Sequence, residues 1–365
     1  MIKSGLSKRP DIVLWSRARL FRNVARQPFI SSDQALENAL TPLDERSIKQ
    51  RKIICEMVSG TIAALYFEQR MQLTKLTELT DAKIFELYEQ GVFSEYFKRA
   101  RYDEYRGIVT GNAGVVRALV NERHHLVLQN IRPGFQLQRV CDEVAQLSEL
   151  FGKALPFAWS KKFGYLMADS ECCGTGLEVT INLHLPGLIL MGEMSEVITA
   201  FNAVGLRLDA EISDDLFVDG FGQQMRVSNN PAVSDSEAGV RRKIEVAVSG
   251  LAKQEAQARL RALEHSKARK TFFNMIACSL AVLKSAVIMD RAQSYENLSW
   301  LRAGLSMGLV KGITLAQLDR VHRDVWSSNF LAYFRGPLDE ALEYVSTARA
   351  TVLRERLSGV KVTFM

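Results

Sequence analysis

The feature of this sequence that most restricts its fold is the stretch LEVTINLHLP at residues 177–186, where apolar and polar residues alternate. The apolar positions are Leu177, Val179, Ile181, Leu183 and Leu185. The polar positions between them are Glu178, Thr180, Asn182 and His184. Because successive side chains of a β-strand point to opposite faces, this period of two predicts a half-buried strand. Such strands are typical of antiparallel sheets, since strands of parallel sheets are apolar on both faces.

The rest of the chain contains further strand-like and helix-like segments. Short strands are predicted at 11–23, 114–120, 125–131 and 225–230. Apolar residues at three- and four-residue steps predict helices over 33–90, 135–152 and 193–204, and an almost continuously helical chain from about residue 235. No βαβ rhythm is present, so we expect an α+β fold. An antiparallel sheet flanked by helices is predicted in residues 1–258, followed by an all-helical domain at 259–365.

Length and composition agree with two domains. A chain of 365 residues is long for one core, and 47% hydrophobic with 24% charged residues is typical of a soluble globular protein. The net charge of +6 comes from 47 basic and 41 acidic residues that are interspersed, so no nucleic-acid surface is predicted. Five cysteines without CxxC spacing predict no metal site.

The sequence also predicts a cytoplasmic location. The first residues, MIKSGLSKRPD, lack an apolar signal core. The most apolar window, 272–289, contains Asn274 and Lys284, so a buried helix is expected there and no membrane span.

Taken alone, the polar motifs leave the chemistry open. Arg17 and Arg19 form an R-x-R pair that a strand would place on one face, where the two guanidinium groups either clamp a phosphate or are solvated. The cluster NERHH at 121–125 is expected at a strand end, and the acidic segment 209–219 lacks the spacing of a calcium loop. No phosphate loop or dinucleotide fingerprint occurs.

Taken in order, several segments resemble the bacterial protein arginine kinases (McsB), which belong to the phosphagen (ATP:guanido) kinase family. DIVLWSRARLFRN at 11–23 is similar to the family's opening D-I-V-L-S-S-R-I-R-L-A-R-N, and NERHHLV at 121–127 to its N-E-E-D-H-L-R. The block GYLMADSECCGTGLEVTINLHLP at 164–186 matches the family pattern without a gap, and 297–313 and 349–357 resemble its tail. The resemblance implies a phosphagen-kinase-like catalytic domain, a helical dimerisation domain, and phosphoryl transfer from Mg·ATP to a guanidinium nitrogen.

The resemblance also implies which site residues are kept and which are replaced. Kept are two phosphate-binding arginines and one glutamate: Arg17, Arg19 and Glu122. The family's base and reactive cysteine fall on Arg123 and Asp169, although Cys172 and Cys173 lie near enough to substitute for that cysteine. Three further phosphate-binding arginines fall on Val127, Glu178 and Asp209. An expected histidine falls on Gly91, and the pair that reads phosphoarginine falls on Val345 and Ser346.

These replacements lead us to predict a catalytically impaired homologue, a pseudokinase that needs no cofactor and acts as a binding or regulatory protein in protein quality control or stress response. Two alternatives stay open. One is an active, divergent protein arginine kinase that uses Glu122, Arg17 and Arg19 with Mg·ATP, and the other is a sensor of phosphoarginine or another small molecule. The resemblance implies a homodimer through the C-terminal domain, and as further partners an McsA-like activator, a Clp-type unfoldase or an active paralogue.

Overall fold

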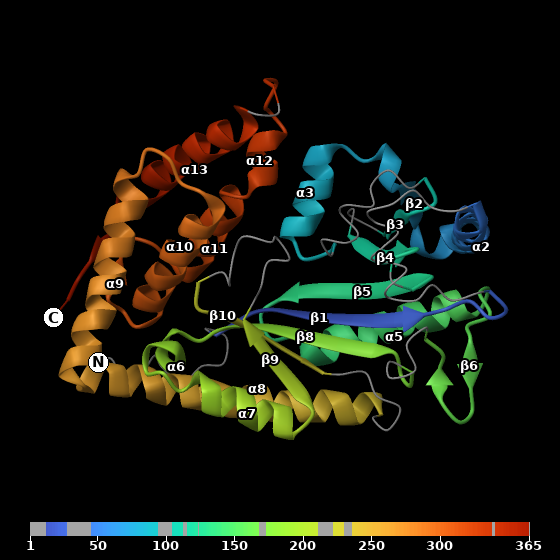
Figure 1. The fold of residues 1–365 in the computed structure, drawn as a ribbon, viewed down its shortest axis with the longest axis horizontal. Helices are drawn as coiled ribbons and strands as arrows, with labels where there is room; N and C mark the ends of the chain where they lie inside the picture. The colour runs from blue at the N-terminus through green and yellow to red at the C-terminus, as the bar shows by residue number, and fades with distance from the viewer. Residues whose placement is uncertain are drawn as a thin grey trace. The chain divides into compact units, whose positions relative to one another are not determined.

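The computed structural model contains one large β-sheet (Figure 1). The described residues are 12–27, 45–93, 104–111, 115–122, 124–167, 173–210, 222–229, 236–337 and 340–364. Within them, eight strands form a sheet in the order β2-β3-β4-β5-β1-β8-β10-β9. Their bounds are β1 Val13–Arg22, β2 Gln72–Lys75, β3 Gly107–Thr110, β4 Val116–Val120, β5 Leu126–Pro133, β8 Leu177–His184, β9 Leu206–Ala210 and β10 Gln224–Asn229. The neighbours from β2 to β1 pair antiparallel, which confirms the predicted sheet.

Helices flank the sheet and make up most of the C-terminal part. Their bounds are α2 Glu45–Gln69, α3 Asp81–Glu89, α5 Leu137–Gly152, α6 Pro186–Leu190, α7 Met194–Ala203, α8 Glu237–Glu264, α9 Ser266–Ser285, α10 Arg291–Ser306, α11 Leu315–Asp324, α12 Ser327–Leu331 and α13 Ala341–Leu357. This arrangement confirms the predicted α+β class. Several strands differ from the predictions: β2 interrupts the helix expected over 33–90, β3 lies where no strand was predicted, and β9 includes Asp209 at the start of the acidic segment. A two-stranded sheet of β11 Val310–Lys311 and β12 Lys361–Val362 also lies in the part predicted to be all-helical.

The chain forms two compact units. The first unit comprises Met1–Leu14, Asn182–Val227 and Val246–Met365, and the second unit comprises Trp15–Ile181 and Ser228–Glu245. The predicted boundary at residue 258 lies inside α8, and the division into domains 1–258 and 259–365 stays a prediction.

In the second unit, the strands carry helices on both faces. Val140, Val144 and Phe151 are buried on α5, which contacts β5. On the opposite face, α3 contributes Leu87 to an apolar cluster with Val127 of β5. Because strand side chains alternate, odd-numbered residues of β1 and β5 point toward α3 and even-numbered residues toward α5. We call these the α3 face and the α5 face.

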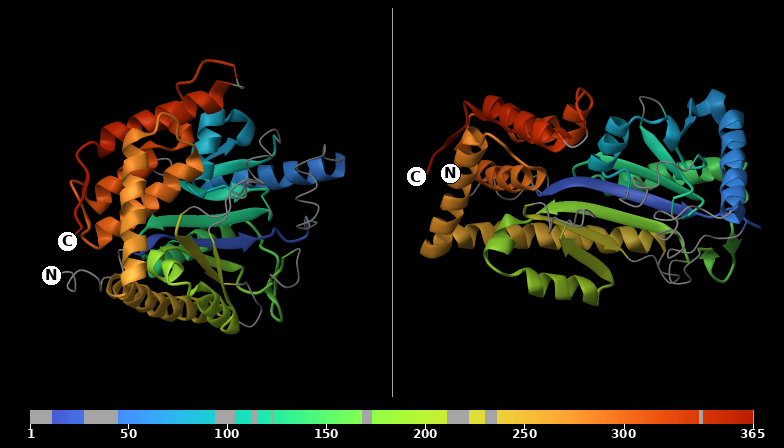
Figure 2. Two further views of the ribbon diagram at one scale, coloured as in Figure 1. Left: turned by 60° about the vertical axis from the view of Figure 1, so that its left-hand side comes forward. Right: turned by 45° about the horizontal axis from the view of Figure 1, so that its top comes forward.

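In the first unit, the tail helices share an apolar core. Contacts join α9 to α10 and α13, and α10 to α11, and Figure 2 shows these helices in orange and red. The core includes Phe272, Ile276, Leu301 and Leu353, all at most 1% exposed. Buried Arg349 of α13 fixes the ends of neighbouring segments, since it donates to the carbonyls of Val325 and Met289 at 3.0 and 2.9 Å.

A buried polar network in the first unit explains the histidine of the H-L-P segment. His184 Nε2 lies 2.9 Å from Ser299 Oγ, which donates to Gln223 Oε1 at 2.7 Å and accepts from the Gln223 amide at 3.1 Å. Because the Ser299 proton is already donated, His184 carries its own proton on Nε2. Burial, together with the charges of Arg259 and Arg302, lowers the pKa of His184 well below 6.5. This histidine is therefore neutral and structural.

Candidate functional site

The R-x-R pair lies on the α3 face of β1, and both guanidinium groups are almost fully buried. Arg17 is 9% exposed and Arg19 is 8% exposed. Arg17 donates to the carbonyl of Gly91 at 2.9 Å and to Thr180 Oγ1 at 3.3 Å. Arg19 donates to the carbonyl of Val92 at 3.1 Å and to Gln129 Oε1 at 3.2 Å. Both cations are thus held by neutral oxygen atoms, so these bonds leave their positive charge in place.

A tight turn after α3 supplies two of these oxygens. The amides of Gly91 and Val92 donate back to the carbonyls of Tyr88 and Leu87, both at 2.9 Å, and Gly91 has φ +70°. This is the geometry of a Schellman helix end, where a left-handed glycine ends the helix at low cost. The left-handed conformation of this helix end therefore explains why a glycine occupies position 91, where the family resemblance expects a histidine. The turn also directs the carbonyls of Gly91 and Val92 toward Arg17 and Arg19.

Val127 lies on the same face but in apolar surroundings. Its side chain is fully buried in a cluster that includes Leu87, Val92, Phe93 and Leu119. An arginine here would place its charge in this cluster without water. An apolar residue such as valine therefore suits this position, which packs against α3 and the turn that follows it.

Glu178 lies opposite Arg19 in the sheet. The amide of Phe21 donates to the carbonyl of Gly176 at 2.9 Å, and Arg17 bonds Thr180, which sets an antiparallel register between β1 and β8. In this register Glu178 faces Arg19, on the same face as Thr180. A carboxylate therefore stands where the family resemblance expects a further arginine.

Glu122 lies in the turn between β4 and β5 and is 2% exposed. The preceding residue, Asn121, has φ +57° and donates to the carbonyls of Arg51 and Tyr105 at 3.0 and 2.7 Å. The turn ends at Leu126, the first residue of β5, which pairs with Arg22 of β1. Arg19 lies three residues before Arg22, so about 10 Å of strand separates Arg19 from this end of the turn. Arg123 lies outside the described residues.

The family-like residues at the end of β1 have structural partners. Arg22 donates to Ser148 Oγ at 3.0 Å and to the carbonyl of Thr175 at 3.0 Å, and its guanidinium lies 3.5 Å from the Tyr165 ring centre. Burial lowers the pKa of Arg22 to about 10. Gly176, with φ +63°, lies so close to the Phe21 carbonyl that a Cβ would be 2.7 Å from it. These contacts explain the G-T-G segment as packing.

The other predicted site residues are placed as follows. Cys173 is buried, and its Sγ lies 3.3 Å from the amide of Met167. Asp169 and Cys172 lie outside the described residues. Asp209 belongs to β9, and Val345 and Ser346 belong to α13, all in the first unit. Val345 is 5% exposed, and the carbonyl of Ser346 accepts from the amide of Met289 at 3.0 Å.

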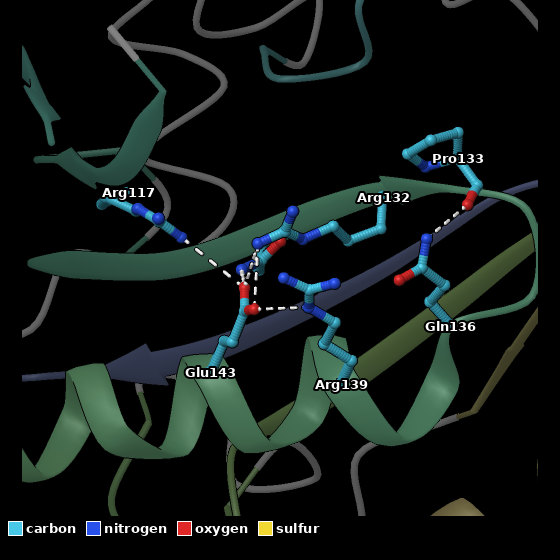
Figure 3. A network of polar contacts seen from close by, with 7 residues as sticks. Arg117, Arg132, Pro133, Gln136, Arg139 and Glu143 are labelled. Carbon is cyan, nitrogen blue, oxygen red and sulfur yellow. Dashed lines mark hydrogen bonds and ion pairs between the residues drawn. The ribbon is translucent and has the colours of Figure 1, made fainter. Parts of the chain in front are cut away.

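A second arginine group, on the α5 face, was not identified by the sequence analysis (Figure 3). Glu143 of α5 accepts from Arg132 at 2.7 and 2.9 Å, from Arg139 at 2.8 Å and from Asn130, and Arg117 lies 3.8 Å away. Arg117 is the extra residue of a β-bulge, since Ala118 pairs with Val109 and Val116 with Thr110. A bulge re-aims a side chain, which accounts for Arg117 pointing toward Glu143.

The ionisation of Glu143 follows from these contacts. Burial raises the pKa of this carboxyl, but hydrogen bonds from Arg132 and Arg139 and the charge of Arg132 outweigh burial and lower the pKa to about 2. Glu143 is therefore ionised at neutral pH, and it offsets part of the positive charge of the surrounding arginines. We call Glu143 and these three arginines the Glu143 cluster.

Comparison with known proteins identifies the family. The family model described as ATP:guanido phosphotransferase, C-terminal catalytic domain, matches residues 53–258, more than half of the chain. The chain belongs to this family. A protein-arginine kinase of Bacillus cereus is 26% identical over 348 residues, which are 95% of this chain and 92% of the relative.

Two solved structures share the fold. Lombricine kinase has a TM-score of 0.54 and 16% identity, and the match covers 71% of this chain and 69% of that one. The substrate-free duplicated taurocyamine kinase of Schistosoma mansoni has a TM-score of 0.50 and 19% identity, and the match covers 70% of this chain and 34% of that duplicated chain. At these identities the likeness shows the fold alone.

Family membership corrects one prediction. No cofactor was expected from the sequence, because Val127, Glu178 and Asp209 replace arginines. ATP, however, is part of the family's description, and relatives over nearly the full length are protein-arginine kinases. The expectation of no cofactor is wrong at the level of the family, which implies Mg·ATP. The pseudokinase prediction is not supported by these findings, which favour the kinase alternative.

The structure offers donors that fit a phosphate group. Arg17 and Arg19 place two buried guanidinium groups on one face, and the amide group of Gln129 lies beside them. Such cations and N–H donors are what a polyphosphate requires.

Among the described residues, no helix is long and apolar enough to cross a membrane.

Proposed function

We propose that this chain is an ATP-dependent phosphotransferase that acts on the guanidino groups of protein arginine side chains. The observation that carries the proposal is the pair of buried guanidinium groups of Arg17 and Arg19 on one face of the family's sheet. Membership in the ATP:guanido phosphotransferase family and the near full-length match to protein-arginine kinases support this substrate class.

In this proposal ATP, bound with Mg²⁺, supplies the phosphoryl group. Arg17 and Arg19 bind its phosphate oxygens and offset the negative charge that spreads over them during transfer. A guanidino nitrogen of the acceptor arginine forms the new N–P bond while the bond to the ADP oxygen breaks. Glu122 accepts the proton that this nitrogen loses, which is the role that the family resemblance leaves to it.

Mass spectrometry of an arginine-rich protein incubated with Mg·ATP tests the proposal. We expect phosphoarginine with the wild type and at least a hundredfold less with Arg17→Ala/Arg19→Ala, because each Arg–phosphate contact contributes roughly 1.5–3 kcal/mol. Arg139→Ala, on the α5 face, is the matched control and keeps wild-type yield. Glu122→Gln lowers the rate roughly 10²–10⁴-fold if Glu122 is the base. Phosphoarginine that does not depend on Arg17 and Arg19 contradicts the site assignment.

A second candidate is a binding protein without turnover, and two observations favour it. Glu178 faces Arg19, and Val127 is buried in apolar contacts where the resemblance expects an arginine. This candidate predicts that Mg·ATP binds but that no phosphoarginine forms under any variant or substrate. Mass spectrometry for phosphoarginine separates the two candidates, and titration calorimetry on the same protein shows that Mg·ATP binds where no product forms.

We also propose self-association through the tail. The outer side of α9 carries exposed Met275 and Val282, 39% and 41% exposed, and Val287 and Ile288 follow the helix with 72% and 60% exposure. A set of exposed apolar residues of this size favours a protein contact. Light scattering should give a dimer mass for the wild type and a monomer mass for Val282→Glu/Ile288→Glu. A monomeric wild type at micromolar concentration contradicts the proposal.

A further inference from the structure

Gln129 has an amide donor that is buried and lacks an acceptor. The residue is 1% exposed, and among the described residues no acceptor lies within hydrogen-bonding distance of its Nε2. Its orientation is fixed, because the Nε of Arg19 only donates and the atom facing it at 3.2 Å has to be Oε1. The unpaired atom is therefore an N–H group, and a buried donor without a partner is destabilising.

The position of Gln129 links this donor to the arginine pair. Gln129 lies directly opposite Arg19 in the β1–β5 register, and Arg17 lies opposite Ile131 on the same face. Val127, where the family resemblance expects a phosphate-binding arginine, is two residues away on the same side of β5. The α3 face thus presents two guanidinium groups and one free amide N–H within neighbouring positions of two paired strands.

We propose that Gln129 is a phosphate-contacting residue whose Nε2–H donates to an oxygen of the ATP phosphates held by Arg17 and Arg19. This inference rests on the proposed function, and it assigns to Gln129 part of the contact that an arginine at position 127 would otherwise make. An amide adds a hydrogen bond without a charge, so it offsets the lost arginine only in part.

The turn after α3 accounts for the burial of the Gln129 amide group when no ligand is bound. The carbonyls of Gly91 and Val92 accept hydrogen bonds from the guanidinium groups of Arg17 and Arg19, which in this proposal bind the phosphates. Phosphate binding replaces these two carbonyls, so the turn has to move away from the arginines. The same movement opens the α3 face beside Arg19, where Gln129 lies.

The variant Gln129→Glu tests the proposal, because it keeps the acceptor for Arg19 and replaces the N–H donor by an oxygen. We expect the Kd for Mg·ATP, measured by calorimetry, to rise about 10- to 100-fold, since one charge-assisted hydrogen bond is lost and a repulsive carboxylate is added. The Tm without ligand should equal or exceed that of the wild type, because the new carboxylate pairs with Arg19. A purely structural role for Gln129 would leave the Kd of the folded variant Gln129→Met unchanged, because this variant removes the N–H donor without adding a charge.

Gln138→Glu is the matched control, because Gln138 is exposed on α5 and its side-chain amide donates to Asp142. It should bind Mg·ATP as the wild type does. If Gln129→Glu does not fold, Gln129→Met takes its place, and its affinity for Mg·ATP is expected to be about tenfold lower than that of the wild type. Wild-type affinity in a folded Gln129 variant, with weak binding in Arg17→Ala/Arg19→Ala, overturns this inference alone. A wild type that does not bind Mg·ATP overturns the proposed function together with this inference.

Discussion

The two arginine groups of the second unit lie on opposite faces of the sheet and differ in what surrounds them. On the α3 face, Arg17 and Arg19 are buried and donate to carbonyl, hydroxyl and amide oxygens. On the α5 face, the arginines of the Glu143 cluster surround an ionised carboxylate, and their side chains are between 29% and 59% exposed. Both groups consist of arginines held in place, but only the group on the α5 face is arranged around a carboxylate that accepts hydrogen bonds from two of its arginines.

This difference indicates which face is suited to an anion. A carboxylate that accepts from several guanidinium groups already occupies the position that a phosphate would need, and solvent screens what charge is left. Neutral oxygens hold a guanidinium in place without cancelling its charge, so an incoming phosphate can replace them. Glu178 is the exception on the α3 face, and it makes this face weaker for anions than the family pattern implies.

The largest expected effect comes from restoring the family's arginine. Val127→Arg should lower the free energy of unfolding by roughly 3–5 kcal/mol, because the charge enters the apolar cluster under α3. Urea unfolding followed by circular dichroism measures the loss, and Val127→Ile is the uncharged control. If Val127→Arg is as stable as the wild type and binds Mg·ATP more tightly, the side chain at position 127 is accessible to ATP and not enclosed by the apolar cluster with α3.

Removing the central carboxylate should destabilise the α5 face alone. Glu143→Gln is expected to cost about 1–2 kcal/mol at neutral pH and to leave the Kd for Mg·ATP unchanged. The pKa of Glu143 is about 2 in the folded protein and near 4.5 when unfolded, so its stabilising effect is present above pH 4.5 and is lost as the pH falls toward 2.

Urea unfolding at several pH values checks this expectation. The stability difference between wild type and Glu143→Gln should shrink steadily from pH 5 to pH 2. A difference that stays constant over this range would show that the carboxylate contributes through packing and not through its charge.

A smaller gain is expected when the negative charge opposite Arg19 is removed. Glu178→Gln should tighten Mg·ATP binding roughly threefold to tenfold, since one carboxylate beside the bound phosphates costs about 1 kcal/mol at the effective dielectric of a protein. Calorimetry at two salt concentrations measures the effect, which should shrink at high salt. Binding that is equal or weaker than that of the wild type would show that Glu178 does not act on the phosphates.

The sequence predicts the fold well where its pattern is long. The alternation at 177–186 corresponds to β8, and the amphipathic segment 135–152 corresponds to α5. The prediction that this strand is half-buried is wrong, because the polar residues Thr180, Asn182 and His184 are at most 1% exposed. The four-residue strand β2 is too short for a period to be visible, and it gains its place from pairing with β3. The bulge at Arg117 likewise depends on register, which the local sequence does not encode.

The candidate site was predictable only in part. The two-residue spacing of Arg17 and Arg19 is enough to place both side chains on one face of a strand, and the strand predicted at 125–131 places Gln129 on the same side as Val127. That Gln129 faces Arg19 follows from strand pairing over more than a hundred residues. The Glu143 cluster joins β4, β5 and α5, so no single motif contains it.

The central claim is that the α3 face, and not the α5 face, receives the phosphates of ATP. Calorimetry with Mg·ATP on two double variants, Arg17→Ala/Arg19→Ala and Arg132→Ala/Arg139→Ala, tests it directly, because each removes two positive charges. Circular dichroism first confirms that both variants fold. We predict that the first raises Kd at least a hundredfold, about 3 kcal/mol or more, and the second changes it by less than threefold. Equal losses, or a larger loss in Arg132→Ala/Arg139→Ala, would contradict the account.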